Sequence, residues 1–107
     1  MENISNQEEL VLLSVGALYP DAYAYAIKEE IKKESGKSMS LGTIHTILYR
    51  LENEGLLKSQ LGGSSSKRGG RSKRLFSLTA KGYRMAEDLR KLRQSLWSRI
   101  SPDQISF

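Results

Sequence analysis

Apolar residues recur at helical spacing in four stretches of the chain. The first stretch covers residues 10–18 and follows Ser5 and Glu8, whose Ser-x-x-Glu spacing is that of a capping box. Its continuous apolar character predicts a deeply buried helix. Pro20 ends this helix, and Asp21 is the candidate cap of the next one.

The second stretch has one apolar and one charged face. Ala24, Ile27 and Ile31 form the apolar face, and Gly36 marks its end. The charged face carries Lys28, Glu29, Lys32 and Lys33. This pattern predicts an amphipathic helix that packs against the first.

The third stretch has the best-defined ends. Ser40 is a cap residue, Met39 and Ile44 are placed to form a hydrophobic staple, and Gly55 suits a left-handed helix end. One stripe is apolar: Leu41, Ile44, Leu48 and Leu51. The opposite side carries small or hydrogen-bonding residues: Gly42, Thr46, Arg50 and Asn53, with Thr43 beside them. Such a face suits a helix that enters a DNA major groove, although an ordinary solvent-facing side has the same composition.

Two short runs with apolar residues, 56–61 and 72–78, enclose a glycine-rich segment at 62–70. They predict a β-hairpin whose long tip projects from the body. Thr79 then caps a last helix, with Leu78 and Tyr83 as a second possible staple.

The last helix has an apolar stripe close to heptad spacing: Met85, Leu89, Leu92, Leu96 and Ile100. Because three helices and a hairpin already close a small core, this stripe favours contact with a second copy of the chain. The alternative is that the helix folds back onto its own core.

The order helix, helix, helix, hairpin, helix predicts a winged helix-turn-helix, mainly α with a small β-hairpin. We expect residues 1–78 to form a DNA-binding unit and residues 79–107 a C-terminal dimerisation helix and tail. Both parts would belong to one compact domain, as the length of 107 residues allows.

Charge adds a candidate partner. The chain has 17 basic and 12 acidic residues, and five of the basic ones lie in residues 67–74. Without these five the rest is balanced, so the whole excess of +5 sits in the hairpin. Clustered Lys and Arg favour a polyanion through counterion release. A solvated surface loop is the plainer interpretation.

The sequence gives little support for a membrane protein, a secreted protein, an enzyme or a metalloprotein. The chain has no cysteine, no apolar run of membrane-spanning length and no signal-peptide pattern, which predicts a soluble cytoplasmic protein. No nucleophile–base pair or phosphate-binding glycine loop is evident, so we expect neither an enzyme nor a cofactor. His45, the only histidine, makes a poor metal site.

Three segments in order resemble the PadR family of transcriptional regulators. Residues 40–44 and 50–57 look like the family's recognition helix and its exit, and residues 69–82 like its second wing strand and the start of its last helix. The likeness covers about residues 8–100. It implies a homodimer, formed through the C-terminal helix, that binds a pseudo-palindromic operator and usually represses.

The chain departs from the family at several places. The family usually has Tyr-Pro where this chain has His45 and Thr46, and His-Gly-Tyr where it has residues 21–23. An aromatic pair is common where Leu75 and Phe76 stand, and the wing is longer and more basic than usual. These differences bear on the preferred DNA sequence, not on the fold.

From these patterns we expect two groups of DNA contacts. The helix would contribute Ser40, Thr43, His45, Thr46, Tyr49, Arg50 and Asn53, although Ser40 also serves as a cap, Tyr49 suits packing, and Arg50 could bind phosphate or a glutamate instead. The wing would contribute Lys67, Arg68, Arg71, Lys73 and Arg74, at phosphates or in the minor groove.

Two further hypotheses stay open. Trp97 is either a packing anchor or a contact for a planar effector, since some drug-sensing PadR proteins stack planar ligands on an aromatic residue of this helix. For the whole chain, the alternatives to a DNA-binding regulator are a non-sequence-specific RNA- or ribosome-associated winged helix and a protein-interaction module.

Overall fold

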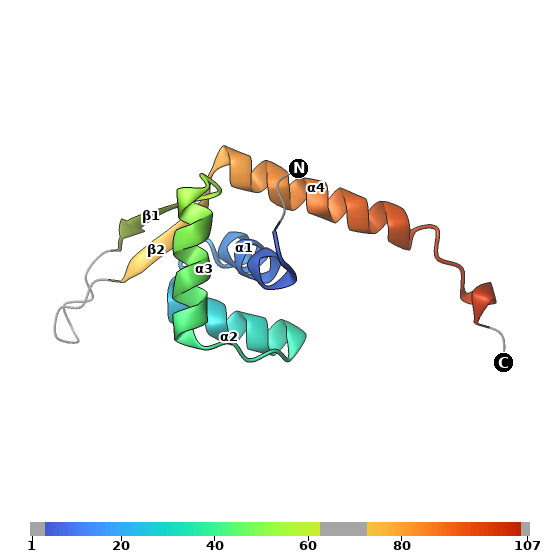
Figure 1. Cartoon of the computed structure of the whole chain (residues 1–107), viewed down its shortest axis with the longest axis horizontal. Helices are drawn as coiled ribbons and strands as arrows, with labels where there is room; N and C mark the ends of the chain where they lie inside the picture. Colours follow the sequence, from blue (N-terminus) through green and yellow to red (C-terminus); the bar gives the residue numbers. More distant parts are fainter. Residues whose placement is uncertain (1–3, 63–72, 106–107) are drawn as a thin grey trace.

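A computed structural model describes residues 4–62 and 73–105. Its elements follow the predicted order (Figure 1). They are α1 (Asn6–Leu18), α2 (Ala24–Ser35), α3 (Leu41–Asn53), β1 (Leu57–Leu61), β2 (Arg74–Leu78), α4 (Ala80–Trp97) and a 3-10 turn, η2 (Pro102–Gln104). The mainly helical winged helix-turn-helix fold is confirmed.

Local capping chemistry sets most helix ends. Ser5 and Glu8 form the predicted capping box. Ser40 and Thr79 cap α3 and α4 by accepting hydrogen bonds from the backbone N–H of the residue three positions later. Gly36 and Gly55 adopt φ of 76° and 78°, the left-handed conformation that a glycine accepts without strain.

One predicted cap is wrong. Asp21 lies before the start of α2, whose N-cap is Tyr23 without a side-chain hydrogen bond. The reason is a backbone pairing: Ala22 forms an isolated antiparallel bridge with Phe76 of β2, and its carbonyl accepts from Phe76 N–H at 2.9 Å. Residues near Ala22 are therefore extended and delay the helix.

The core lies between α1, α2, α3 and the hairpin. Val11, Leu12 and Val15 of α1 are fully buried at its centre. On α3 the buried residues are Ile44, Ile47, Leu48 and Leu51. Leu41 belongs to the predicted apolar stripe, but it is 40% exposed because it lies in the first turn of α3. Ile47, which was not part of the predicted stripe, is buried in the core instead.

The hairpin is antiparallel, with Leu57 opposite Leu78 and Leu61 opposite Arg74. Its buried side faces the helices through Leu57 and Phe76. The strands lead away from the body toward residues 63–72, which lie outside the described residues (Figure 1).

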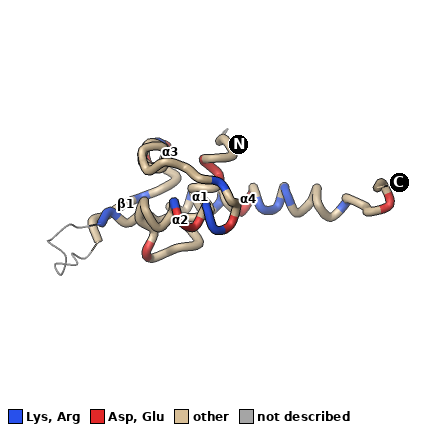
Figure 2. The backbone as a smooth tube through the Cα atoms, turned by 90° about the horizontal axis from the view of Figure 1, so that it is seen from below, with Lys and Arg blue, Asp and Glu red and all other residues tan. Residues whose placement is uncertain are grey.

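The last helix divides into two halves with different surroundings. Its first half packs on α1 and β2, and there Met85 and Leu89 are buried in the protomer's own core. Its second half extends beyond the body, at the opposite end of the molecule from the hairpin (Figures 1 and 2). There Leu92 and Leu96 are about half exposed. The apolar stripe is thus buried in the core at its first end and exposed to solvent at its second. The helix ends at Trp97, so Ile100, the last residue of the predicted stripe, lies beyond it.

In the described part of the chain, every helix is too short or too polar to span a membrane.

Candidate nucleic-acid interface

The outward side of α3 presents polar groups to solvent. Gly42, Thr46, Arg50 and Asn53 are exposed, as the helical spacing predicts, and His45 is exposed as well. Thr46 Oγ1 donates to the Gly42 carbonyl at 3.0 Å, and the residue remains exposed. A methyl group and hydrogen-bonding groups on one face are what a base edge in a major groove can meet.

The first turn of α3 is internally hydrogen-bonded. Ser40 Oγ accepts from Thr43 N–H at 3.1 Å and lies 3.0 Å from Thr43 Oγ1, to which it donates. Ser40 is therefore foremost a helix cap. Thr43 is half-buried, so of the two hydroxyls the one on Ser40 is the more accessible.

An aromatic run joins α3 to the hairpin. The rings of His45 and Tyr49 stack with centroids 6.1 Å apart, and Tyr49 meets Phe76 edge-on at 6.5 Å. Tyr49 thus has a packing role, while about half of its surface remains exposed. Phe76 is buried, so this contact fixes the hairpin against α3.

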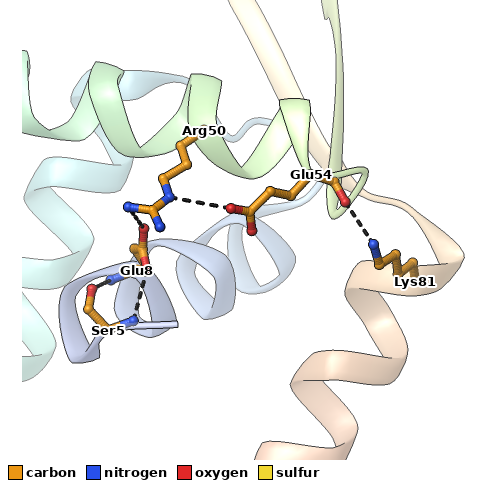
Figure 3. Close-up of polar contacts among 5 residues, drawn as sticks. All are labelled: Ser5, Glu8, Arg50, Glu54 and Lys81. Carbon is orange, nitrogen blue, oxygen red and sulfur yellow. Dashed lines mark hydrogen bonds and ion pairs between the residues drawn. The ribbon is translucent and has the colours of Figure 1, made fainter. Parts of the chain in front are cut away.

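Arg50 is held by two acids (Figure 3). Its Nη1 is 3.2 Å from Glu8 Oε2 of α1, and its Nε donates to Glu54 Oε2 at 3.3 Å. The sequence left open whether Arg50 would meet DNA or a glutamate, and in the free protein it meets two. A shallow groove beside it, between the start of α1 and α3, is lined by Ser5, Gln7, Glu8, Ser40, Gly42, Thr43, Thr46, Ile47 and Arg50.

Two basic residues at the start of β2, next to residues 63–72, are held in place by neighbours. Lys73 Nζ lies 4.0 Å from the centroid of the Tyr23 ring, a cation–π contact. Arg74 Nη1 donates to Ser59 Oγ at 3.0 Å. Ser59 in turn donates to Glu52 of α3 at 2.6 Å, so β1 is tied to α3. Lys67, Arg68 and Arg71 lie outside the described residues.

A second surface lies along α4. An open groove of about 810 Å³ runs between α1 and α4, and Leu13, Tyr83, Leu96 and Trp97 line it. Trp97 is 68% exposed, so it is not a packing anchor within the protomer.

An ion pair marks the inner end of this groove. Arg93 Nε donates to Glu9 Oε2 at 2.8 Å, and Nη2 donates to the other oxygen. The hydrogen bond and charge of Glu9 raise the pKa of Arg93 further above its usual value. The pair fastens α4 to α1 where the second half of α4 leaves the body.

Within residues 4–62 and 73–105, no three His, Asp or Glu side chains lie close enough together to hold a metal ion. His45 stacks on Tyr49 instead.

Three helices, a hairpin with basic residues at the start of its second strand and a polar outward face on α3 define a winged helix-turn-helix protein. Residues 12–88 match the family described as the transcriptional regulator PadR-like family. Because the match covers more than half of the chain, the protein belongs to this family of transcriptional regulators. No curated protein matches the chain.

Solved structures have the same fold. A PadR-like transcription factor from Bacteroides fragilis is 26% identical, with 86% of this chain and 84% of that chain covered and a TM-score of 0.70. A PadR-like transcriptional regulator from Bacillus cereus is 20% identical over 94% and 93%, with a TM-score of 0.75. Bacillus subtilis PadR, solved in complex with operator DNA, is 20% identical over 81% and 48%, with a TM-score of 0.67.

The partners that hold the candidate contact residues in place were not predicted from the sequence. Glu8 was assigned only to a capping box, and Glu54, Tyr23 and Ser59 were given no role. Glu54 could have been found, because an Arg and a Glu four residues apart lie on the same helix face. The contacts of Glu8 and Tyr23 depend on tertiary packing and have no local signal.

Proposed function

We propose that the protein is a homodimeric, sequence-specific DNA-binding regulator that represses from a pseudo-palindromic operator. The observation that carries the proposal is the exposed polar face of α3 together with a hairpin whose second strand begins with basic residues, in a member of a transcriptional regulator family. The Bacillus subtilis relative with operator DNA supports duplex DNA as the partner.

In this proposal α3 is the recognition helix. His45, Thr46, Arg50 and Asn53 approach base edges in the major groove, while the Ser40 end of the helix lies near the backbone. Thr43 and Tyr49 contribute at the margin of this contact, since each is partly occupied by a neighbour. Sequence preference would come from this helix.

The hairpin is the wing, which supplies affinity. Lys73 and Arg74, together with Lys67, Arg68 and Arg71 in the segment between the strands, would contact phosphates or enter the minor groove. If three or four of these residues engage in each subunit, a dimer makes roughly six to eight contacts, with a salt slope of about −0.9 per contact.

The dimer would form through the second half of α4. Leu92 and Leu96 of this half are about half exposed, and so is Ile100, which follows the end of the helix, so all three are available to a second copy. Met85 and Leu89 are buried in the protomer's own core, so they would stabilise the position of α4 without contacting the second copy directly. A two-fold dimer accounts for a palindromic operator, with half-sites about 34 Å or a multiple of that apart.

An effector belongs to the proposal as a separate hypothesis. Trp97 lies on the α4 groove with the apolar Leu13 and the aromatic Tyr83, a setting suited to a planar molecule. Titrating planar aromatic compounds while recording tryptophan fluorescence tests it directly, because Trp97 is the only tryptophan. Unchanged emission at saturating concentrations contradicts it.

A gel-shift series tests the main proposal. The protein is titrated against the DNA upstream of its own gene and against an unrelated duplex, at several salt concentrations. We expect tighter binding to the first duplex and a steep loss of affinity with salt. Weak and equal binding would favour the RNA- or ribosome-associated alternative, and no binding would favour a protein-interaction module. A reporter gene behind the bound DNA then gives the sign of regulation.

A further inference from the structure

The guanidinium of Arg50 lies between carboxylates from two helices (Figure 3). Glu8 of α1 contacts Nη1, and Glu54, at the end of α3, contacts Nε. The side chain of Arg50 is nevertheless 61% exposed. The two acids therefore restrain the guanidinium without withdrawing it from the surface.

Glu8 is a rigid anchor for this contact. Its side chain is only 8% exposed, and its Oε1 accepts from Ser5 N–H at 2.8 Å while its own N–H donates to Ser5 Oγ at 3.1 Å. The capping box thus fixes the carboxylate and directs Oε2 toward Arg50. Because one partner is already ordered, holding Arg50 costs less side-chain entropy than an isolated surface pair would.

The charges around Arg50 cancel. Glu8 and Glu54 carry two negative charges, and Lys81, whose Nζ donates to the Glu54 carbonyl at 2.9 Å, supplies a second positive one. Arg50 therefore brings no net positive charge to the surface. Phosphate binding rewards net positive charge, so a phosphate gains no net Coulombic attraction from this cluster. A guanine edge is uncharged and offers acceptors for guanidinium N–H groups.

We propose that Glu8 and Glu54 are positioning residues, which direct Arg50 to a base edge and prevent it from acting as a phosphate contact. Glu8 contacts Nη1 and Glu54 contacts Nε, and the Arg50 side chain remains 61% exposed, so its guanidinium is still accessible to a base edge. This inference rests on the proposed sequence-specific binding of duplex DNA. It makes specificity depend on an acid in the first helix, outside the recognition helix.

Replacing Glu8 by Gln tests the proposal, because Gln preserves the capping-box spacing and removes only the charge. Binding is measured to a duplex that the wild-type protein selects from a random-sequence library and to an unrelated duplex, each over a salt series. For Glu8→Gln we expect the preference for the selected duplex to fall about tenfold and binding to the unrelated duplex to strengthen about threefold. The salt slope should steepen by up to about 0.9 per subunit as Arg50 turns to phosphate.

Two further variants separate positioning from simple charge. Asp88→Asn on α4 changes the net charge equally at an exposed site and should leave the preference unchanged. Arg50→Ala should lose preference about tenfold with the salt slope unchanged, because no phosphate contact is removed. If Glu8→Gln lowers the melting temperature, Glu54→Gln, which leaves the capping box intact, gives the same test.

The inference is overturned if Glu8→Gln, or Glu54→Gln in its place, affects both duplexes equally, as Asp88→Asn does, or if Arg50→Ala makes the salt slope shallower. A wild-type protein that does not distinguish the two duplexes would overturn the proposed function itself. The two failures are therefore distinguishable.

Discussion

Gly82 of α4 lies directly against the backbone of Leu56, the residue that precedes β1. A Cβ atom built on Gly82 would stand 2.0 Å from the Leu56 carbonyl oxygen. That oxygen also accepts from Thr79 N–H at 3.1 Å, so it cannot easily move away. The backbone of the start of α4 and the backbone before the hairpin are thus in direct contact.

The first prediction is that Gly82→Ala destabilises the fold. The clash is with backbone, so the cost should reach the upper end of overpacking effects, about 3 kcal/mol. For a domain of this size that lowers the melting temperature by roughly 10 °C or more. Gly42→Ala is the matched control, since its nearest atom outside the helix backbone is Ser40 Oγ at 3.8 Å, and its melting temperature should not fall. Equal stability of the two variants would contradict the packing argument.

A second prediction concerns the cation–π contact that holds Lys73 over Tyr23. Tyr23→Leu removes the ring and frees Lys73, which should weaken binding to selected and unrelated duplexes alike by about threefold. Tyr23→Phe retains the ring and should bind as the wild type does. Fluorescence anisotropy with labelled duplexes measures both. A change in preference between duplexes, in place of a uniform loss, would show that Tyr23 acts on α3 and not on the wing.

The third prediction is that charge on the second half of α4 breaks the dimer. Leu92→Glu or Leu96→Glu places a carboxylate on a face that is half exposed in the protomer, so folding should survive while association fails. Light scattering coupled to gel filtration should show a dimer for the wild type and a monomer for either variant. Tyr25→Glu, at an equally exposed residue of α2, should remain dimeric. A wild-type monomer at high concentration contradicts the proposed assembly.

A fourth prediction follows from the ion pair of Arg93 with Glu9. Arg93→Met leaves the buried Glu9 carboxylate without its partner, so α4 should open more often from α1. Hydrogen exchange should then be faster for amides of α4 near residue 93, with little change in α2. Unchanged protection of α4 would show that apolar packing alone holds it.

The pH dependence of this pair has a definite sign. The pKa of Arg93 is raised in the folded protein, so its contribution is fully present below its ordinary value and is lost only as pH rises through the raised one. Arg93 therefore adds no pH dependence to stability near neutrality. A loss of stability between about pH 7 and 9 that disappears in Arg93→Met would contradict this.

Helix ends were predictable where the chemistry is local. Ser5, Ser40 and Thr79 cap through the backbone N–H three residues on, and Gly55 supplies a left-handed turn, all readable from short spacings. The wrong prediction of Asp21 as a helix cap has a non-local cause. Its neighbour Ala22 pairs with Phe76, and a backbone bridge between distant residues leaves no pattern in side-chain type.

The stripe of α4 shows a second limit. Heptad spacing identifies which residues share a face but not what covers them. Met85 and Leu89 are buried in the protomer's own core. Leu92 and Leu96 are not, because the second half of α4 extends beyond the rest of the domain. Helical spacing was enough to predict which side of α3 is exposed. The ion pair between Glu8 and Arg50 was not predictable in this way, because folding alone brings these two residues together.

The division of α3 into a buried stripe and an exposed face has a consequence for redesign. His45, Thr46 and Asn53 are exposed, while stability rests on Ile44, Ile47, Leu48 and Leu51 behind them. Randomising the three exposed positions would therefore yield a library of mostly folded proteins with altered base-facing chemistry. The chain is in this sense a scaffold on which recognition can diverge while the architecture persists.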